Sequence, residues 1–273
     1  MSAPRPTPPL GPYPYLDTPR PIAFAHRGGA AHGDENSTAA LARAIATGYR
    51  YIETDVHVSS DGIPVLFHDT TLERLTGDAR RVEDVTWTDL ASIRVNGETL
   101  VPRLDDVLGT WPDIRFNIDV KSDQAVHATL TALRAADAFD RALIGSFSDA
   151  RLARVRRLAG PRLATSMGPR EVATFKAATY TGRLWPRARL GYTRGAIALQ
   201  VPHHYGRLRV VDRRFVEYAH QLGLDVHVWT VDDTATINTL LDLGVDGIMT
   251  DRLEVLRDAY AARGHWPEPT PGR

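Results

Sequence analysis

The chain has 273 residues, 43% of them hydrophobic, which is enough to fill the core of one large domain. Because 33 lysines and arginines balance 33 aspartates and glutamates, the net charge gives no reason to expect the broad basic surface of a nucleic-acid-binding protein. Cysteine is absent, which excludes disulfides, thiolate catalysis and cysteine-ligated zinc, so any metal must be bound by oxygen or imidazole.

The first 20 residues are rich in proline and lack the basic start and apolar run of a signal peptide, so we expect an extended N-terminal arm over 1–20. Charges interrupt every later apolar stretch before it reaches the roughly 20 residues of a membrane-spanning helix. We therefore expect a cytoplasmic protein with at most peripheral membrane contact. Residues 21–263 are expected to form one domain, followed by a tail over 264–273.

From residue 22 onward, short β-type runs alternate with helical segments, the pattern of βα units and a parallel sheet. Eight runs are found: Ile22 to His26, Tyr51 to Val58, Arg115 to Val120, Ala142 to Phe147, Arg162 to Ser166, Ala196 to Val201, Asp225 to Val231 and Gly247 to Thr250. Helical periodicity is clearest over Ala39 to Thr47, Ala125 to Ala136, Arg213 to Leu222 and Thr234 to Leu243, with glycine stops at Gly48, Gly223 and Gly244. Eight repeats predict an α/β fold, a closed TIM (β/α)8 barrel.

An open doubly wound sheet is the alternative fold, but His26-Arg27-Gly28-Gly29 does not have the glycine spacing that binds phosphate in such sheets. Asp61-Gly62 is a tight-turn signal, so the second strand is expected to extend or fold back before His68 reaches the rim. The polar, strand-poor residues 70–101 predict a short insertion after this strand. It could form a lid, a small subdomain or a dimer contact.

Charged and aromatic residues fall at the C-terminal ends of the predicted strands, where barrel active sites are built. Because strand side chains alternate between faces, Glu53 and Asp55 point the same way, together with His57. Carboxylates removed from water are costly unless they are paired or bind a cation. This face therefore predicts a metal site or a cationic clamp, with a buried ion network to Arg27 and Lys121 as the structural alternative.

The ordered set of strand-end segments resembles the glycerophosphodiester phosphodiesterase family, whose members are TIM barrels related to phosphatidylinositol-specific phospholipases C. The matching segments are Ala25-His26-Arg27-Gly28, Glu35-Asn36-Ser37-Thr38, Glu53-Thr54-Asp55-Val56, Asp61-Gly62, Val65-Leu66-Phe67-His68-Asp69, Asp119-Val120-Lys121, Ser146-Phe147, Trp229-Thr230-Val231 and Gly244-Val245-Asp246-Gly247. The resemblance implies metal-dependent hydrolysis of a small-molecule glycerophosphodiester to sn-glycerol 3-phosphate and an alcohol.

The resemblance also implies roles for individual residues. Glu53, Asp55 and Asp119 match the carboxylates that hold one divalent cation, commonly Ca²⁺ or Mg²⁺. His26 and His68 match the pair implied as general acid and base, in either order.

Three further residues are expected to bind the substrate. Arg27 and Lys121 would neutralise charge on the phosphoryl oxygens. Trp229 either lines the pocket over the glycerol or plugs the barrel as part of the core. A non-catalytic phosphate-binding module is a further alternative, but the intact histidine pair argues against it.

Asp119-Val120-Lys121 departs from the Glu-x-Lys of most family members and is similar to sphingomyelinase D relatives. This departure raises an alternative function, a phospholipase D-like or lyase activity on lysolipids or sphingolipids. Arg183, Arg187, Arg189 and Arg194, with Trp185 and Tyr192, form either a lipid-contacting segment or a solvated face.

The loop after the first strand carries two polar residues for which two roles are possible. Glu35 and Asn36 either cap the helix that begins near Ser37 or support Arg27. His57 is expected to be structural.

Overall fold

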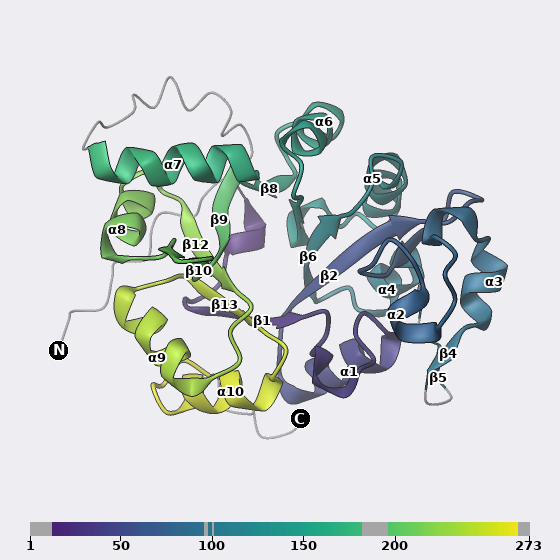
Figure 1. Cartoon of the computed structure of the whole chain (residues 1–273), viewed down its shortest axis with the longest axis horizontal. Helices are drawn as coiled ribbons and strands as arrows, with labels where there is room; N and C mark the ends of the chain where they lie inside the picture. Colours follow the sequence, from purple (N-terminus) through teal and green to yellow (C-terminus); the bar gives the residue numbers. More distant parts are fainter. Residues whose placement is uncertain (1–12, 96–97, 100, 182–195, 267–273) are drawn as a thin grey trace.

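The computed structural model describes residues 13–95, 98–99, 101–181 and 196–266, which form a closed barrel of parallel strands (Figure 1). The eight strands are β1 (Ile22–His26), β2 (Tyr51–Val58), β6 (Arg115–Val120), β7 (Ala142–Gly145), β8 (Ala164–Ser166), β9 (Ala196–Pro202), β12 (Asp225–Trp229) and β13 (Gly247–Thr250). Strand β1 pairs with both β13 and β2, which closes the sheet. The predicted TIM barrel is confirmed, and the open sheet is excluded.

Helices surround the barrel and connect its strands (Figure 1). They are α1 (Thr38–Thr47), α4 (Leu104–Thr110), α5 (Ala125–Ala135), α6 (Asp149–Ala159), α7 (Pro169–Thr181), α8 (Arg213–Gln221), α9 (Thr234–Leu243) and α10 (Leu253–Ala261). The four helices predicted from periodicity lie within one residue of their expected bounds. Gly48 and Gly244 end α1 and α9 in the left-handed conformation, at φ values of 108° and 84°, which glycine adopts without steric cost.

The two faces of β2 show how the barrel interior is divided. Ile52 and Val56 belong to the apolar core between the sheet and the helices. Tyr51 faces the other way and packs with Phe24 and other residues of the barrel bottom. Glu53, further along this inner face, lines a cavity at the top. The interior is therefore mainly apolar at one end, where His227 also packs against Phe24, and charged at the other.

The described end of the N-terminal arm covers the bottom of the barrel. A 3₁₀ turn over Pro14–Leu16 places Tyr15 fully out of solvent, edge-on to Tyr51 at a ring distance of 5.3 Å. Residues 1–12 of the predicted arm and 267–273 of the predicted tail lie outside the described residues.

Strand β2 continues beyond the barrel, and β3 (Pro64–Leu66) folds back antiparallel against it, as the Asp61-Gly62 turn predicts. The backbone N of Phe67 donates to the carbonyl of Asp55 at 3.0 Å, so the chain returns beside the barrel mouth just before His68. This pairing delivers His68 to the rim.

The insertion that follows packs as a small unit on one side of the barrel (Figure 1). It contains α2 (Glu73–Thr76), a 3₁₀ turn over Val82–Asp84, α3 (Trp87–Ser92), β4 (Arg94–Val95) and β5 (Glu98–Thr99). Its apolar residues Leu72, Val82, Val85, Leu90 and Val101 form a separate core cluster together with Val65 and Phe67, from β3 and the residue after it. Of the three expectations for 70–101, these contacts match a small subdomain.

A short hairpin of β10 (His204–Tyr205) and β11 (Leu208–Arg209) follows β9. The arginine-rich stretch from 183 to 194 lies outside the described residues, so its proposed lipid contact stays a prediction. No helix among the described residues is both long and apolar enough to cross a membrane.

Candidate active site

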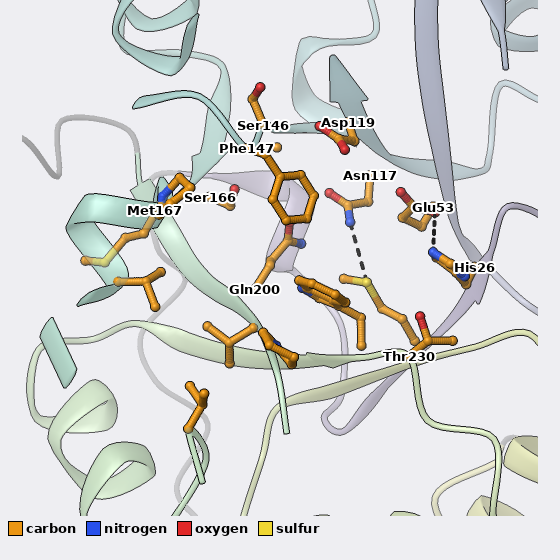
Figure 2. A pocket seen from close by; sticks show the side chains of 18 of the residues that line it. His26, Glu53, Asn117, Asp119, Ser146, Phe147, Ser166, Met167, Gln200 and Thr230 are labelled. Carbon is orange, nitrogen blue, oxygen red and sulfur yellow. Dashed lines mark hydrogen bonds and ion pairs between the residues drawn. The ribbon is translucent and has the colours of Figure 1, made fainter. Parts of the chain in front are cut away.

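His26 ends strand β1, and carboxylates lie on both sides of its ring. Its Nδ1 is 2.7 Å from Oδ1 of Asp251. Its Nε2 is 3.7 Å from Oε2 of Glu53, the ion pair drawn in Figure 2. Burial alone would lower the pKa of His26, but the Glu53 charge and the Asp251 hydrogen bond outweigh burial and raise it. Asp251 is itself held by its backbone N, which donates to Asp232 at 2.8 Å. The ring is thus fixed at Nδ1, with Nε2 toward Glu53.

Arg27 adopts a left-handed backbone, at a φ of 53°, directly after β1. Its backbone N donates to Oε2 of Glu53 at 3.2 Å, and its guanidinium donates to Glu35 at 2.9 Å. Its Nε also lies 3.2 Å from Oδ2 of Asp55. Arg27 is therefore held among three carboxylates at the top of the barrel.

The two polar residues before α1 support the site. Ser37 caps the helix, because its side chain accepts from the backbone N of Ala40 at 3.1 Å. The side-chain NH₂ of Asn36 donates to Oδ2 of Asp55 at 2.9 Å, and its Oδ1 accepts from the Thr54 hydroxyl at 2.7 Å. The capping hypothesis for Glu35 and Asn36 is therefore wrong. Glu35 supports Arg27, as the second interpretation predicts.

The carboxylates of β2 and β6 face each other across paired strands, because Asp55 is in register with Asp119. Lys121 Nζ lies 2.7 Å from an oxygen of each. Burial alone would raise the pKa of Asp55, but the Lys121 and Arg27 charges outweigh it and lower that pKa. Glu53 behaves differently, since burial and then the Asp55 charge raise its pKa to about 7. The buried carboxyl of Glu53 thus has too little positive charge around it to stay ionised at its ordinary pKa.

The predicted metal ligands can be compared with these contacts. No group of three or more His, Asp or Glu side chains within the described ranges converges as a preformed metal site. The chemistry of the donors nevertheless fits a hard cation, since all three predicted ligands are carboxylates. Oδ1 of Asp119 is buried and has no hydrogen-bond partner. The raised pKa of Glu53 also indicates that this carboxylate has too little positive charge around it.

His68 enters the site from the loop after β3. Its Nδ1 is 2.5 Å from Oδ1 of Asp69, and Oδ2 of Asp69 accepts from Nε of Arg74 at 2.5 Å. His57 lies behind this loop, with Nε2 3.3 Å from the carbonyl of His68. His57 therefore contacts the His68 backbone, in keeping with the structural role expected for it.

All eight residues predicted for the site line one cavity of about 570 Å³ at the C-terminal ends of the strands. They are His26, Arg27, Glu53, Asp55, His68, Asp119, Lys121 and Trp229. Trp229 lines this cavity, packs edge-on against Phe147 at a ring distance of 5.6 Å, and also packs against the apolar cluster inside the barrel. The structure thus brings the predicted residues together, while their individual roles remain predictions.

The far side of the same cavity is mainly apolar, although Ser166, Lys176 and Gln200 also line it. Figure 2 shows Phe147 and Met167 on the side away from His26 and Glu53. The apolar lining residues there are Met167, Pro169, Val172, Ala173, Val201, Pro202, Leu208 and Val210. No motif indicates this wall in the sequence, because its residues come from separate segments: the loop after β8, α7, β9, and the β10–β11 hairpin with the residue that follows it.

Sequence reasoning also missed Asp251 and Arg74. Asp251 comes directly after the eighth predicted strand, and its position at the barrel rim was the signal that could have found it. Arg74 lies in the insertion, where no strand end marks it.

Closed α/β barrels with titratable side chains at the C-terminal rim form a class of enzymes. The sequence matches the model of the glycerophosphoryl diester phosphodiesterase family over residues 26–255. It is 37% identical over 246 residues to a protein of Mycobacterium tuberculosis named probable glycerophosphodiester phosphodiesterase 2, covering 90% of this chain and 92% of that protein. The chain belongs to this family. It is an enzyme, a phosphoric diester hydrolase.

Solved structures share the fold. The glycerophosphodiester phosphodiesterase of Agrobacterium tumefaciens superposes with a TM-score of 0.72 at 22% identity, covering 88% of this chain and 99% of that one. A phosphodiesterase of Oleispira antarctica, solved in complex with the product sn-glycerol-3-phosphate, has a TM-score of 0.70 at 21% identity and covers 89% and 97%. At these identities the comparison establishes the fold.

Proposed function

We propose that the chain hydrolyses glycerophosphodiesters to sn-glycerol 3-phosphate and an alcohol, with His26 and His68 as general acid and base. The observation that carries the proposal is that both imidazoles line one cavity with Arg27, Lys121 and the acidic cluster. The named product of the Oleispira structure supports the same product class.

The two imidazoles divide the proton transfers between them. One accepts the proton of the attacking hydroxyl as its oxygen bonds to phosphorus, and the other donates a proton to the departing alkoxide as the second P–O bond breaks. Asp251 and Asp69 each contact a ring at Nδ1, which leaves Nε2 as the nitrogen that exchanges protons with substrate.

A phosphodiester anion repels a nucleophile, so positive charge must surround it. Arg27 and Lys121 would supply two charges, and Trp229 would cover the glycerol. Glu53, Asp55 and Asp119 would hold one divalent cation, Ca²⁺ or Mg²⁺, whose chemistry when bound is to withdraw charge from the phosphoryl oxygens. The partnerless Oδ1 of Asp119 and the raised pKa of Glu53 support this assignment.

The test is a panel of glycerophosphocholine, glycerophosphoethanolamine and related diesters, incubated with and without chelator and coupled to glycerol-3-phosphate dehydrogenase. We expect chelator-sensitive product from at least one member. Product that is insensitive to chelator would remove the cation from the proposal, and no product from any member would overturn the proposal itself. Oxygen-18 from labelled water in the first phosphate product distinguishes direct attack by water from a cyclic intermediate.

A second candidate substrate is suggested by the apolar wall of the cavity. Phe147, Tyr205 and Leu208 line the cavity, yet 67%, 77% and 52% of their surfaces remain exposed. Exposed apolar surface that continues a ligand cavity favours a hydrocarbon chain, as in a lysophospholipid. A lysophospholipid substrate also agrees with the aspartate at position 119, where most family members have glutamate.

Lysophosphatidylcholine and glycerophosphocholine should be compared as substrates for the wild type and for Leu208→Ser. If the wall binds a chain, the substitution raises KM for the lysolipid alone. Leu158→Ser, at an exposed leucine of α6 outside the cavity, is the matched control. An equal effect of Leu208→Ser on both substrates would argue against this candidate.

A further inference from the structure

Arg74 of the insertion joins two carboxylates that belong to different loops at the barrel rim. Its Nε donates to Oδ2 of Asp69 at 2.5 Å. Its two terminal nitrogens donate to the two oxygens of Glu35, at 3.1 and 2.6 Å. One planar guanidinium thus makes a two-pronged contact with Glu35 and a third bond with Asp69, a geometry that matches its fixed fork of donors.

Each of these carboxylates has its second partner in the proposed catalytic machinery. Oδ1 of Asp69 contacts Nδ1 of His68 at 2.5 Å. Oε1 of Glu35 also accepts from the guanidinium of Arg27 at 2.9 Å. A continuous chain of contacts therefore runs from His68 through the insertion to Arg27.

The charges along this chain keep both acids ionised. Burial alone would raise the pKa of Glu35, but hydrogen bonds and charges from Arg74 and Arg27 outweigh it and lower that pKa. Burial likewise opposes ionisation of Asp69, and hydrogen bonds from Arg74 and His68 lower its pKa. An ionised Asp69 can only accept at Nδ1 of His68, which fixes the tautomer and leaves Nε2 free to act on substrate.

We propose that Arg74 is a positioning residue, which aims Asp69 at His68 and Glu35 at Arg27, so that the insertion is a working part of the active site. The inference rests on the proposed roles of His68 and Arg27. Arg74 makes no contribution to the apolar cluster of the insertion, and 47% of its side chain is exposed. Its removal should therefore affect the geometry of the site more than the stability of the fold.

The test compares Arg74→Ala and Arg74→Lys with wild type on glycerophosphocholine. Misplacing a catalytic group by a fraction of its working distance costs on the order of 10- to 100-fold in rate, so we expect kcat of Arg74→Ala to fall by that factor. KM should change much less, because the Nε of Arg27 keeps its own contact with Asp55, which does not involve Arg74. Lysine carries the charge but cannot bridge both acids in a fork, so Arg74→Lys should recover only part of kcat.

A double-mutant cycle with Asp69→Asn separates positioning from a general structural effect. If Arg74 acts through Asp69, Arg74→Ala lowers kcat by less than about threefold once Asp69 is replaced. An equal loss of kcat in both backgrounds, or unchanged kcat in Arg74→Ala, would overturn the inference. Thermal unfolding of each variant verifies that it is folded.

Arg80→Ala is the matched control, since Arg80 is an exposed arginine of the same insertion that pairs with Asp78. It should keep wild-type kcat. Failure of this inference is distinct from failure of the proposed function. In the first case the wild type and Arg74→Ala both release glycerol 3-phosphate at similar rates, and in the second the wild type releases none.

Discussion

Glu53→Gln should stabilise the protein at alkaline pH while it removes activity. Burial, and then the Asp55 charge, raise the pKa of Glu53 from an ordinary 4.5 to about 7. Below pH 4.5 the carboxyl is protonated in both the folded and unfolded states. As the pH rises toward 7 the unfolded state ionises first, so the free energy of unfolding falls across this window, and the stability that the neutral Glu53 carboxyl contributes is lost above the folded pKa. The interval of about 2.5 in pH corresponds to about 3 kcal/mol.

Glutamine has the same shape as glutamate and can still accept from the backbone N of Arg27, but it carries no charge to desolvate. In chelator, we expect Glu53→Gln to raise the free energy of unfolding by about 3 kcal/mol at pH 8 and by less than about 0.5 kcal/mol at pH 4.5. Urea denaturation at the two pH values measures the difference. Glu217→Gln, on an exposed position of α8, is the control. A gain of equal size at both pH values, or a loss at pH 8, would refute the reasoning.

Three further predictions concern the cation, His26 and Trp229. Ca²⁺ or Mg²⁺ at about 100 times its Kd should stabilise the wild type by about 2.7 kcal/mol. Calorimetry at pH 8 should show this stabilisation in the wild type and not in Asp119→Asn. If Asp119→Asn is stabilised as much as the wild type, Asp119 is not a ligand of the cation. Asp251→Asn removes a charge that raises the pKa of His26, so the limb of the pH–rate profile that reports His26 should move to lower pH; an unmoved profile would show that Asp251 does not tune this ring. Trp229→Ala should raise KM for glycerophosphocholine about fivefold, or about 1 kcal/mol, with a smaller change in kcat; an unchanged KM would place Trp229 outside the substrate site.

The barrel was predictable because each strand is a short β-type run and helical segments separate most of these runs, three of them with a glycine stop. The strand ends then located the site, since every barrel strand delivers its last side chains to one rim. The fold-back of β3 was also predictable, because Asp61-Gly62 interrupts an apolar run before His68.

The remaining contacts depend on packing between distant segments, which no local pattern records. Glu35 and Asn36 look like helix caps in the sequence, but Ser37 takes that place and frees them to hold Arg27 and Asp55. Arg74 reaches the site only because the insertion folds against the barrel mouth. The apolar wall is likewise assembled from segments that are separate along the chain.

The central claim is that two imidazoles in one cavity share the proton transfers of phosphodiester hydrolysis. The most direct measurement is the turnover of His26→Ala and His68→Ala on glycerophosphocholine and on a 4-nitrophenyl phosphodiester, whose leaving group needs no proton. Each variant should lose roughly 10²- to 10⁴-fold on the choline diester. The variant that lacks the general acid should keep near wild-type turnover on the nitrophenyl ester, whereas the other should not. Wild-type turnover by either variant on the choline diester would contradict the account.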